Sequence, residues 1–212
     1  MMRALDLFCG AGGVSKGLSG AGFGVVGWDI DPQPRYPFEF VQGDAFDAGS
    51  RWFDFVWASP PCQFATAYRR RKGHCKEAVN LIARVREMLK ATGKPYIIEN
   101  VVGARDWLID PIQLCGSSFG LDVRRHRLFE CSFPVEPPPC EHSWQTPRFP
   151  QATNRKNLRS TVEVGVWRIP LEAQQKAMGI DWMTREELSQ AIPPAYAEFL
   201  GRAAMKHIEG TE

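Results

Sequence analysis

Hydrophobic residues in the first half of the chain form short runs that alternate with amphipathic stretches. The runs, which have the length of buried strands, lie at residues 3–8, 24–28, 39–41, 53–58 and 96–98. Two helices are predicted between them, over residues 14–21 and 76–91. The second helix should bury a face made by Val79, Ile82, Ala83, Val85 and Leu89. Strands separated by helices predict an α/β fold with a doubly wound, mostly parallel sheet.

The alternation stops between residues 134 and 165, where three consecutive prolines precede polar, basic sequence. We therefore predict three parts: an α/β domain over residues 1–133, a short loop-rich insertion over residues 134–165, and a C-terminal segment over residues 166–212 that returns to the first domain. Residues 185–206 should form two helical pieces, the second of which begins at Pro193-Pro194.

Composition narrows the class of protein. The chain has 212 residues, enough for one ordinary domain, and its net charge of +2 is too small to predict a nucleic-acid partner. Cations nevertheless cluster along the chain, and local basic patches can hold phosphates. The clusters are Arg69 to Lys72, Arg124 to Arg127, and Arg155, Lys156 and Arg159.

The six cysteines show no disulfide framework, and Asp6 interrupts the only apolar stretch that could open a signal segment. No apolar stretch approaches the roughly 18 residues that a membrane span requires. We expect an intracellular, reduced protein without a membrane segment.

Polar residues gather where the predicted strands end, the edge at which parallel sheets bind ligands. They are Gly10, Asp29, Asp44, Cys62 and Glu99. The glycine-rich turn at residues 10–13 lets a ligand approach the backbone, although it differs from the dinucleotide and phosphate-binding patterns. Asp29 could accept from ribose hydroxyls and Asp44 from an adenine amino group. Each acid alone fits a helix cap or turn residue better than a ligand contact, but together they outline a nucleoside pocket.

The sequence Ser59-Pro60-Pro61-Cys62-Gln63 places one thiol just past a buried strand, ahead of the basic run at Arg69 to Lys72. This arrangement suits a nucleophile that faces a polyanion, whereas the alternative is a half-buried structural cysteine followed by a solvated charge run.

Two further groups could assist this thiol. A buried Glu99 beside the thiol could donate a proton, unless it is only an acid at a helix N-terminus. Arg125 and Arg127 should share one side of an extended segment and hold a phosphate or a base edge, unless they mark a solvated strand edge.

In combination these motifs are specific. The chain resembles the S-adenosylmethionine-dependent DNA (cytosine-5)-methyltransferases in the order of its motifs. These are DLFCGAGG, an acid after the second strand, Gly-Asp after the third strand, SPPCQ, ENV and RxR. The resemblance covers nearly the whole chain except residues 134–165. It implies a Rossmann-like methyltransferase fold, S-adenosylmethionine as cofactor, double-stranded DNA as partner, and a target-recognition role for residues 134–165.

The resemblance also assigns roles. The cofactor-binding residues would be Phe8, Gly10, Gly12, Asp29, Ile30, Asp44 and Gln190. The catalytic residues would be Cys62 as nucleophile, Glu99 as the acid that engages cytosine N3, and Arg125 and Arg127. A thiolate that adds to C6 activates C5 toward the methyl donor, and it requires a base extruded from the duplex. The expected DNA contacts are Arg69, Arg70, Arg71, Lys72, Arg155 and Lys156.

Three features depart from the family's pattern. Val123 replaces the glutamine before the RxR segment, which should cost some stabilisation of the arginines, and Gln190 replaces an asparagine, which should reshape the cofactor pocket. The short recognition region predicts a short or loosely specified target. The compact size of the chain suggests a phage or prophage origin. We expect a monomer. We expect it to act at the nucleoid, in the cytoplasm of a bacterial or phage-infected cell. Restriction–modification is one role open to it.

Other readings remain open. The same chemistry could act on RNA such as tRNA, or the chain could be a catalytically silent DNA-binding homologue. A cysteine hydrolase using Cys62 with His74 or His126 would leave the pocket acids unexplained. Cys131, Cys140 and His142 suggest zinc, but their spacing matches no common pattern and a fourth ligand, such as Cys115, would be needed, so we expect no metal.

Overall fold

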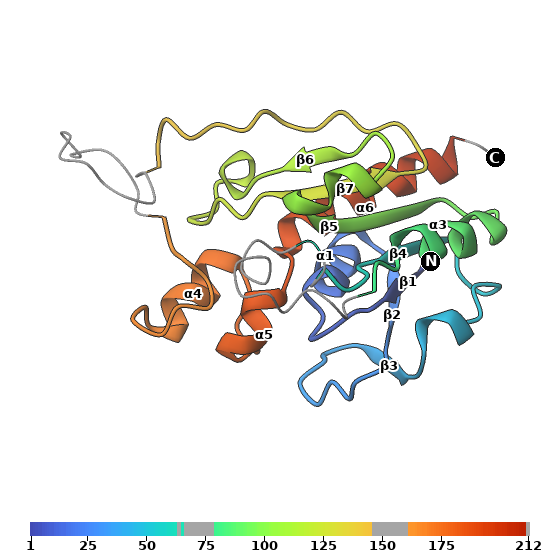
Figure 1. Cartoon of the computed structure of the whole chain (residues 1–212), viewed down its shortest axis with the longest axis horizontal. Coiled ribbons are helices and arrows are strands. Elements are labelled where there is room, and N and C mark those ends of the chain that lie inside the picture. Colours follow the sequence, from blue (N-terminus) through green and yellow to red (C-terminus); the bar gives the residue numbers. More distant parts are fainter. Residues whose placement is uncertain (63–64, 66–78, 146–160, 211–212) are drawn as a thin grey trace.

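A seven-stranded sheet forms the centre of the protein in the computed structural model (Figure 1), which describes residues 1–62, 65, 79–145 and 161–210. Its order is β3-β2-β1-β4-β5-β7-β6. The strands are β1 (Arg3–Leu7), β2 (Gly24–Asp29), β3 (Glu39–Gln42), β4 (Phe55–Ala58), β5 (Tyr96–Val101), β6 (Ile112–Leu114) and β7 (Arg127–Cys131). The pairings among β1 to β5 are parallel, whereas β7 runs antiparallel to β5 and β6. The predicted mostly parallel, doubly wound α/β sheet is confirmed.

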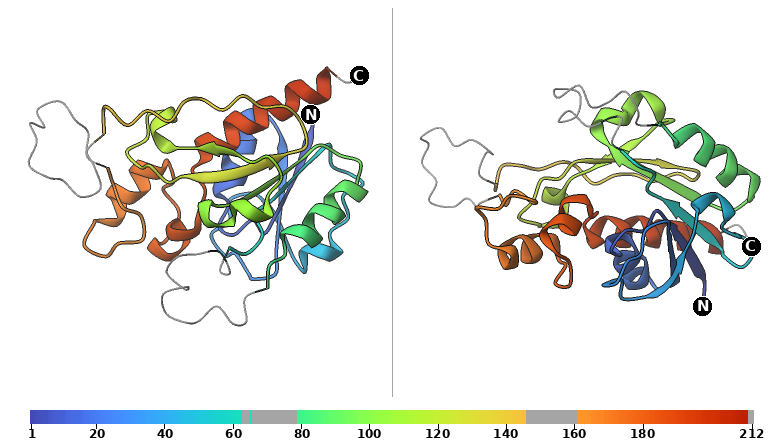
Figure 2. Two further views of the ribbon diagram at one scale, coloured as in Figure 1. Left: turned by 45° about the horizontal axis from the view of Figure 1, so that its top comes forward. Right: turned by 60° about the horizontal axis from the view of Figure 1, so that its bottom comes forward.

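Helices cover both faces of the sheet. The α-helices are α1 (Gly13–Ala21), α3 (Ile82–Ala91), α4 (Leu171–Met178), α5 (Arg185–Gln190) and α6 (Pro194–Glu209). Short 3-10 helices are η1 (Ala45–Asp47), η4 (Val102–Trp107) and η5 (Gly116–Phe119). Figure 2 shows α1 and α6 together on one face and α3 on the opposite face. The two predicted helical pieces of residues 185–206 are therefore confirmed as α5 and α6.

The strands read as continuous hydrophobic runs because both of their faces are buried. In β4, Phe55 and Trp57 pack on the side of α1 and α6, while Val56 and Ala58 pack on the side of α3. All four side chains are fully buried. This double burial fixes the end of β4, and so the start of the loop that carries Cys62.

The C-terminal segment is locked onto the glycine turn by close backbone packing. A Cβ at Gly17 of α1 would lie 2.2 Å from the carbonyl oxygen of Pro194, and one at Gly13 would lie 2.5 Å from that of Ile192. No side chain fits at either position, so α1 and the start of α6 pack backbone to backbone. This contact places the α5–α6 connection beside the carboxyl ends of the central strands.

The helix expected over residues 76–91 begins later than predicted. It begins at Ile82, where the Asn80 side chain accepts a hydrogen bond from the Ile82 backbone amide at 3.0 Å. Val79 and Ala83, expected in the buried face, are exposed. That face instead includes Arg86, whose guanidinium pairs with Glu130 of β7 at 2.6 Å. Residues 76–78 lie outside the described residues.

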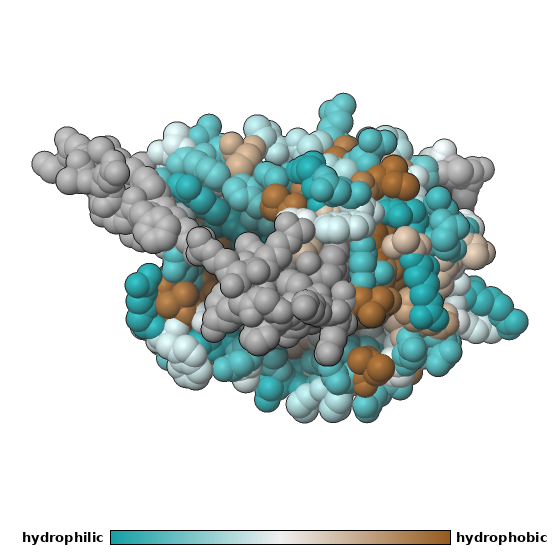
Figure 3. Space-filling model, in the orientation of Figure 1, coloured by the Kyte–Doolittle hydropathy of each residue, from teal (hydrophilic) through white to brown (hydrophobic). Residues whose placement is uncertain are grey.

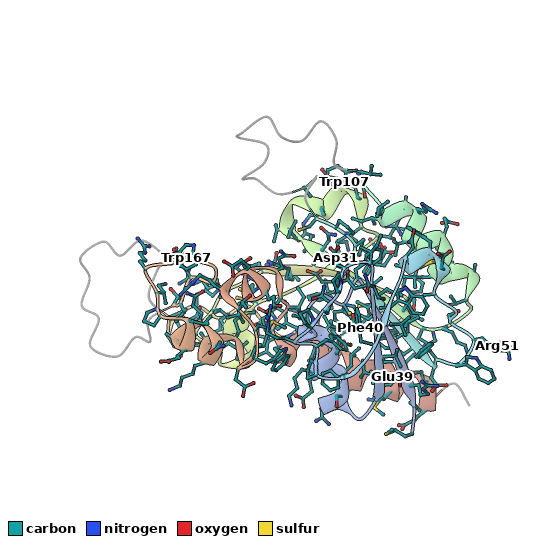
Figure 4. The ribbon with its side chains drawn as sticks, turned by 90° about the horizontal axis from the view of Figure 1, so that it is seen from below. Asp31, Glu39, Phe40, Arg51, Trp107 and Trp167 are labelled. Atoms are coloured by element: carbon teal, nitrogen blue, oxygen red, sulfur yellow. The ribbon has the colours of Figure 1, made fainter. Side chains whose placement is uncertain are left out.

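On the face shown in Figure 3, the hydrophobic side chains of the described residues do not gather into one patch. In the view of Figure 3 the hydrophobic residues outside the grey atoms are scattered among hydrophilic ones. Trp167, which is 77% exposed, lies at the end of the molecule formed by α4 and α5, and Arg51 lies near the opposite end (Figure 4). Among the described helices, none has both the length and the apolar character needed to cross a bilayer.

Candidate active site

The glycine turn after β1 leaves room above its backbone. Gly10 and Gly12 have φ values of 48° and 89°, which glycine adopts without steric cost, whereas Phe8, at φ 57°, is in a left-handed conformation that residues with a side chain rarely adopt. A Cβ at Gly10 would meet nothing within 4 Å, whereas one at Gly12 would lie 3.0 Å from the Tyr36 ring. The indole nitrogen of Trp182 donates to the Ala11 carbonyl at 2.8 Å and ties the turn to the C-terminal segment. The turn is therefore rigid, yet open on the side where Gly10 faces outward.

Asp29, the last residue of β2, is held against this turn. Its Oδ2 accepts from the Gly10 amide at 2.8 Å and its Oδ1 from the Asp31 amide at 3.1 Å. A carboxylate oxygen offers two acceptor directions, so each oxygen keeps one for a hydroxyl donor. The adjacent Ile30 is 63% exposed and offers apolar surface at the same edge.

Asp44 serves the chain itself as a cap. Its Oδ1 accepts from the Phe46 amide at 3.0 Å and begins η1, while its carbonyl accepts from the Trp28 indole at 3.0 Å. The capping alternative raised by the sequence is thus realised. The adenine contact of Asp44 stays a prediction, because Oδ2 of the same carboxylate takes no part in the cap and can still accept a hydrogen bond.

The loop after β4 presents Cys62 through backbone contacts on both sides. The Ser59 amide donates to the Leu7 carbonyl at 3.1 Å, and the Asn100 side chain donates to the Pro60 carbonyl at 3.0 Å. The Ala65 amide then donates to the carbonyl of Cys62 at 2.9 Å. The Cys62 side chain is half-buried at the carboxyl ends of β4 and β5. Sequence reasoning assigned no role to Asn100, although it lies in the ENV motif.

Burial raises the pKa of the Cys62 thiol, and the charge of Glu99 raises it further. The charges of Arg127 and Arg125 act in the opposite direction. The thiol is therefore a poor nucleophile while Glu99 is ionised, and a better one when Glu99 is neutral.

Glu99 lies inside β5 and is only 6% exposed. Burial raises its pKa to about 7, although Arg127, Arg125 and Ser59 act to lower it. Arg127, from the neighbouring strand β7, places Nε 3.2 Å from Glu99 Oε1. Because Glu99 lies within a strand, the alternative of a helix N-terminal acid is wrong. Its carboxyl group can hold a proton near neutral pH and is oriented by a guanidinium.

Arg125 departs from the predicted extended segment. Its φ is +29°, and β7 begins only at Arg127, so the two arginines do not follow one extended strand. The turn allows Arg125 to donate to the carbonyls of Ala191 and Ser189, each at 2.7 Å, while the Tyr196 hydroxyl donates to the Arg125 carbonyl at 3.0 Å. Burial, with the nearby Arg127 charge, lowers the pKa of Arg125 to about 9.

These bonds bring distant parts of the sequence together. Gln190, the last residue of α5, lies between the two residues whose carbonyls accept from Arg125. Val123, which replaces the expected glutamine, is buried in a cluster with Ala11 and Met178. Arg125 is thus held by backbone carbonyls, and the residue at position 123 contributes packing.

A buried acid in β1 was also missed. Asp6 is fully buried, accepts from the Ser15 hydroxyl at 2.5 Å, and leaves Oδ1 without a partner among the described residues. Ser15 in turn lies 2.5 Å from the Tyr36 hydroxyl. Burial raises the pKa of Asp6 to about 7. The sequence feature that could have identified Asp6 is an acidic residue in the middle of a hydrophobic run.

Several expected contacts lie outside the described residues. They are Arg69, Arg70, Arg71, Lys72, Arg155 and Lys156, together with His74. Of the residues that suggested zinc in the sequence, Cys140, His142 and Cys115 lie together, whereas Cys131, in β7, is not part of their group. The group consists of Cys115, His126, Cys140 and His142.

The chain is similar to known proteins in both sequence and fold. Residues 2–106 match the family model of C-5 cytosine-specific DNA methylases. A "Probable DNA (cytosine-5)-methyltransferase" of Frog virus 3 is 27% identical over 216 residues, which covers 92% of this chain and 96% of the viral protein.

Solved structures show the same fold at low identity. A candidate DNA modification methyltransferase encoded within an E. coli prophage has a TM-score of 0.62 at 15% identity and covers 99% of this chain and 100% of its own. The S. pombe Dnmt2 methyltransferase has a TM-score of 0.62 at 13% identity, and covers 98% of this chain and 99% of its own. These likenesses support the Rossmann-like methyltransferase fold.

Proposed function

Because the chain belongs to the C-5 cytosine-specific DNA methylases, we propose that Cys62 bonds covalently to C6 of a cytosine flipped out of double-stranded DNA while a methyl group is transferred to C5. The enzyme is a DNA (cytosine-5)-methyltransferase that uses S-adenosylmethionine. The observation that carries the proposal is the meeting of a half-buried thiol with a buried acid of raised pKa at the ends of adjacent strands.

The residues around the glycine turn fit the cofactor. Gly10 is open to approach, and Asp29 keeps an acceptor direction on each oxygen for the ribose hydroxyls. Ile30 offers exposed apolar surface for adenine, beside Asp44 for its amino group. Phe8 and Gly12 would line the turn, with Gln190 toward the methionine end. When bound, S-adenosylmethionine supplies an electrophilic methyl group.

Cys62 and Glu99 would act together on the base. The Cys62 thiolate adds to C6 and forms an S–C6 bond, while the electron pair of the C5–C6 double bond moves through the ring toward N3. Glu99 delivers its proton to N3, so the ring does not accumulate negative charge. C5 then carries the electron density needed to take the methyl group. The methyl group would reach C5 as its bond to the donor sulfur breaks. A base then removes the C5 proton, the S–C6 bond breaks as the C5–C6 double bond re-forms, and N3 returns its proton to Glu99 as the thiolate leaves.

The pKa values of the two groups are matched to this sequence of events. An ionised Glu99 opposes formation of the thiolate, but a protonated Glu99 does not. The charges of Arg127 and Arg125 then favour the thiolate without a competing carboxylate. A protonated Glu99 would therefore supply the proton for N3 and also remove one of the charges that oppose the thiolate.

The two arginines would be positioning residues with different partners. Arg127 orients the Glu99 carboxyl group through the 3.2 Å contact. Arg125 connects the catalytic edge to two carbonyls at the C-terminal end of α5, those of Ser189 and Ala191. A movement of residues 166–212 would therefore change the position of Glu99 through the segment from Arg125 to Arg127.

DNA would be held by two basic segments, one after Cys62 within the catalytic domain and one in the recognition region. We propose residues 1–133 as the catalytic and cofactor-binding domain, residues 134–165 as the target-recognition region, and residues 166–212 as the returning segment. Phosphate contacts would come from Arg69, Arg70, Arg71, Lys72, Arg155 and Lys156. Extrusion of the cytosine costs a few kcal/mol, which these contacts would help to repay.

A methyl-transfer assay tests the proposal. The protein is incubated with labelled S-adenosylmethionine and cytosine-containing duplex DNA, and the label is located on the digested nucleosides. Label should appear at cytosine C5 with the native protein and with Cys131→Ser, a control cysteine in β7. Label that persists with Cys62→Ala would overturn the mechanism. Transfer to tRNA in preference to DNA would overturn the substrate, and no transfer to either would favour a silent homologue.

A further inference from the structure

Four potential metal ligands meet beside the β6–β7 hairpin. Cys115 follows β6 directly, His126 precedes β7, and Cys140 and His142 belong to the chain that continues after β7. Their ligand atoms all lie within 4.8 Å of one another. Cys115 Sγ and Cys140 Sγ each lie 3.2 Å from His142 Nε2, and His126 Nε2 lies 3.3 Å from Cys140 Sγ.

These separations are close to those of a tetrahedral zinc centre. Zn–S bonds of about 2.3 Å and Zn–N bonds of about 2.0–2.1 Å place neighbouring ligand atoms roughly 3.4–3.8 Å apart. The observed sulfur–nitrogen separations are a few tenths of an ångström shorter, and the longest separation is 4.8 Å. Small side-chain rotations would equalise them. Two thiolates and two imidazoles are a ligand set that zinc prefers.

The backbone around the cluster is fixed by contacts that do not involve the four ligands. The Gly116 amide donates to the Arg124 carbonyl at 2.9 Å, and a Cβ at Gly116 would lie 2.0 Å from the Val123 carbonyl oxygen. The Ser118 hydroxyl donates to the Pro139 carbonyl at 2.7 Å, one residue before Cys140. The site is thus held in place from both of its cysteine-bearing segments.

A neighbouring hydroxyl supports one of the sulfur atoms. Ser117 Oγ donates to Cys115 Sγ at 3.1 Å, the kind of outer contact that orients a ligating thiolate. A plain hydrogen-bonded cluster of thiols and imidazoles explains some of the short contacts. It does not explain why four side chains from three separated segments converge on one point.

We propose that Cys115, His126, Cys140 and His142 bind one zinc ion as a structural site. All four positions would be filled by protein, so none stays open for substrate. The ion would fasten the segment that begins the proposed recognition region to the β6–β7 hairpin. His126 lies between Arg125 and Arg127, so the same ion would stabilise the turn that carries the two arginines.

Metal content tests the proposal without reference to activity. The native protein and Cys131→Ser, whose cysteine lies outside the cluster, should each contain about one zinc ion per chain by elemental analysis. Cys140→Ser and His142→Ala should bind zinc at least 10-fold more weakly. Cys140 is exposed and His142 half-buried, so neither substitution disturbs the core.

Cobalt substitution and metal chelation test the zinc site independently of elemental analysis. Cobalt(II) in place of zinc should show the visible bands of tetrahedral coordination and a thiolate charge-transfer band that weakens in Cys140→Ser. A chelator should lower the Tm of the native protein and of Cys131→Ser, and added zinc should restore it, while the Tm of Cys140→Ser should not respond.

Three results would overturn the site. The first is negligible zinc in the native protein even after reconstitution with zinc. The second is an equal loss of zinc from Cys131→Ser and from Cys140→Ser. The third is a disulfide bond between Cys115 and Cys140 in protein that has normal methyl-transfer activity. Because metal content is read directly, loss of this proposal would leave the methyl-transfer proposal intact, and the reverse also holds.

Discussion

Replacement of Glu99 by glutamine should remove part of the pH dependence of stability. Burial raises the pKa of Glu99 to about 7 in the folded protein, from 4.5 for the free side chain. The folded state therefore binds the proton more tightly than the unfolded state. The resulting stabilisation is full below pH 4.5 and is lost as the pH rises through about 7. Glutamine resembles the neutral acid and can still accept from Arg127.

The size of the effect follows from these two pKa values. Between about pH 5 and about pH 8, linkage gives a loss of about 2.5 kcal/mol from the free energy of unfolding of the native protein. Asp6, whose pKa burial also raises to about 7, adds a similar loss to both proteins. The difference between the native protein and Glu99→Gln isolates the contribution of Glu99.

Urea unfolding at several pH values measures this difference. The two curves of stability against pH should diverge by about 2.5 kcal/mol from pH 5 to pH 8, with the variant less sensitive to pH. Glu198→Gln, on the partly exposed face of α6, controls for the chemical change and should follow the native curve. Parallel curves for the native protein and Glu99→Gln would refute the raised pKa, and with it the role of Glu99 as a proton donor near neutral pH.

The remaining predictions concern the cofactor turn, the helix contact and the Cys62 loop. Asp29→Ala should weaken S-adenosylmethionine binding about 10- to 100-fold by calorimetry, because charged hydrogen bonds are worth roughly 1.5–3 kcal/mol, and unchanged affinity would contradict its ribose role. Gly17→Ala places a Cβ 2.2 Å from a carbonyl oxygen of α6, so it should lower the free energy of unfolding, measured by urea denaturation, by about 1–3 kcal/mol. Gly49→Ala is the control, because a Cβ at Gly49 meets nothing within 4 Å and should leave the free energy of unfolding unchanged. Asn100→Ala leaves the Pro60 carbonyl without its donor and should slow methyl transfer about 10-fold while cofactor affinity is retained; an unaltered rate would remove Asn100 from the support of Cys62.

The sheet could be predicted from the sequence because its strands are buried on both faces. Within the predicted run of residues 53–58, the part that forms β4 is hydrophobic at every position, a pattern typical of a parallel strand covered on both faces. The start of α3 could not be predicted in the same way. Val79 fits the helical period, but the Asn80 side chain accepts from the Ile82 amide, and this local hydrogen bond takes the place of a preceding helical turn.

The parts of the site that depend on long-range contacts were not accessible to sequence reasoning. Arg125 leaves the extended conformation because backbone carbonyls at Ser189 and Ala191 accept from it, and no local pattern records them. His126 joins Cys115 and Cys140 only because the β6–β7 hairpin and the following chain meet. Cys62 and Glu99 could be proposed from sequence since each lies in a short motif at a strand end.

The most direct test of the central claim is covalent trapping on fluorinated DNA. A duplex with 5-fluorocytosine at its target cytosines cannot lose a proton from C5, so a complex joined through C6 should accumulate with S-adenosylmethionine present. Mass spectrometry of the native protein should show a DNA adduct at Cys62, and Cys62→Ser should show none. An adduct at any other residue, or labelled methyl transfer to ordinary duplex DNA without trapping on the fluorinated one, would contradict the account.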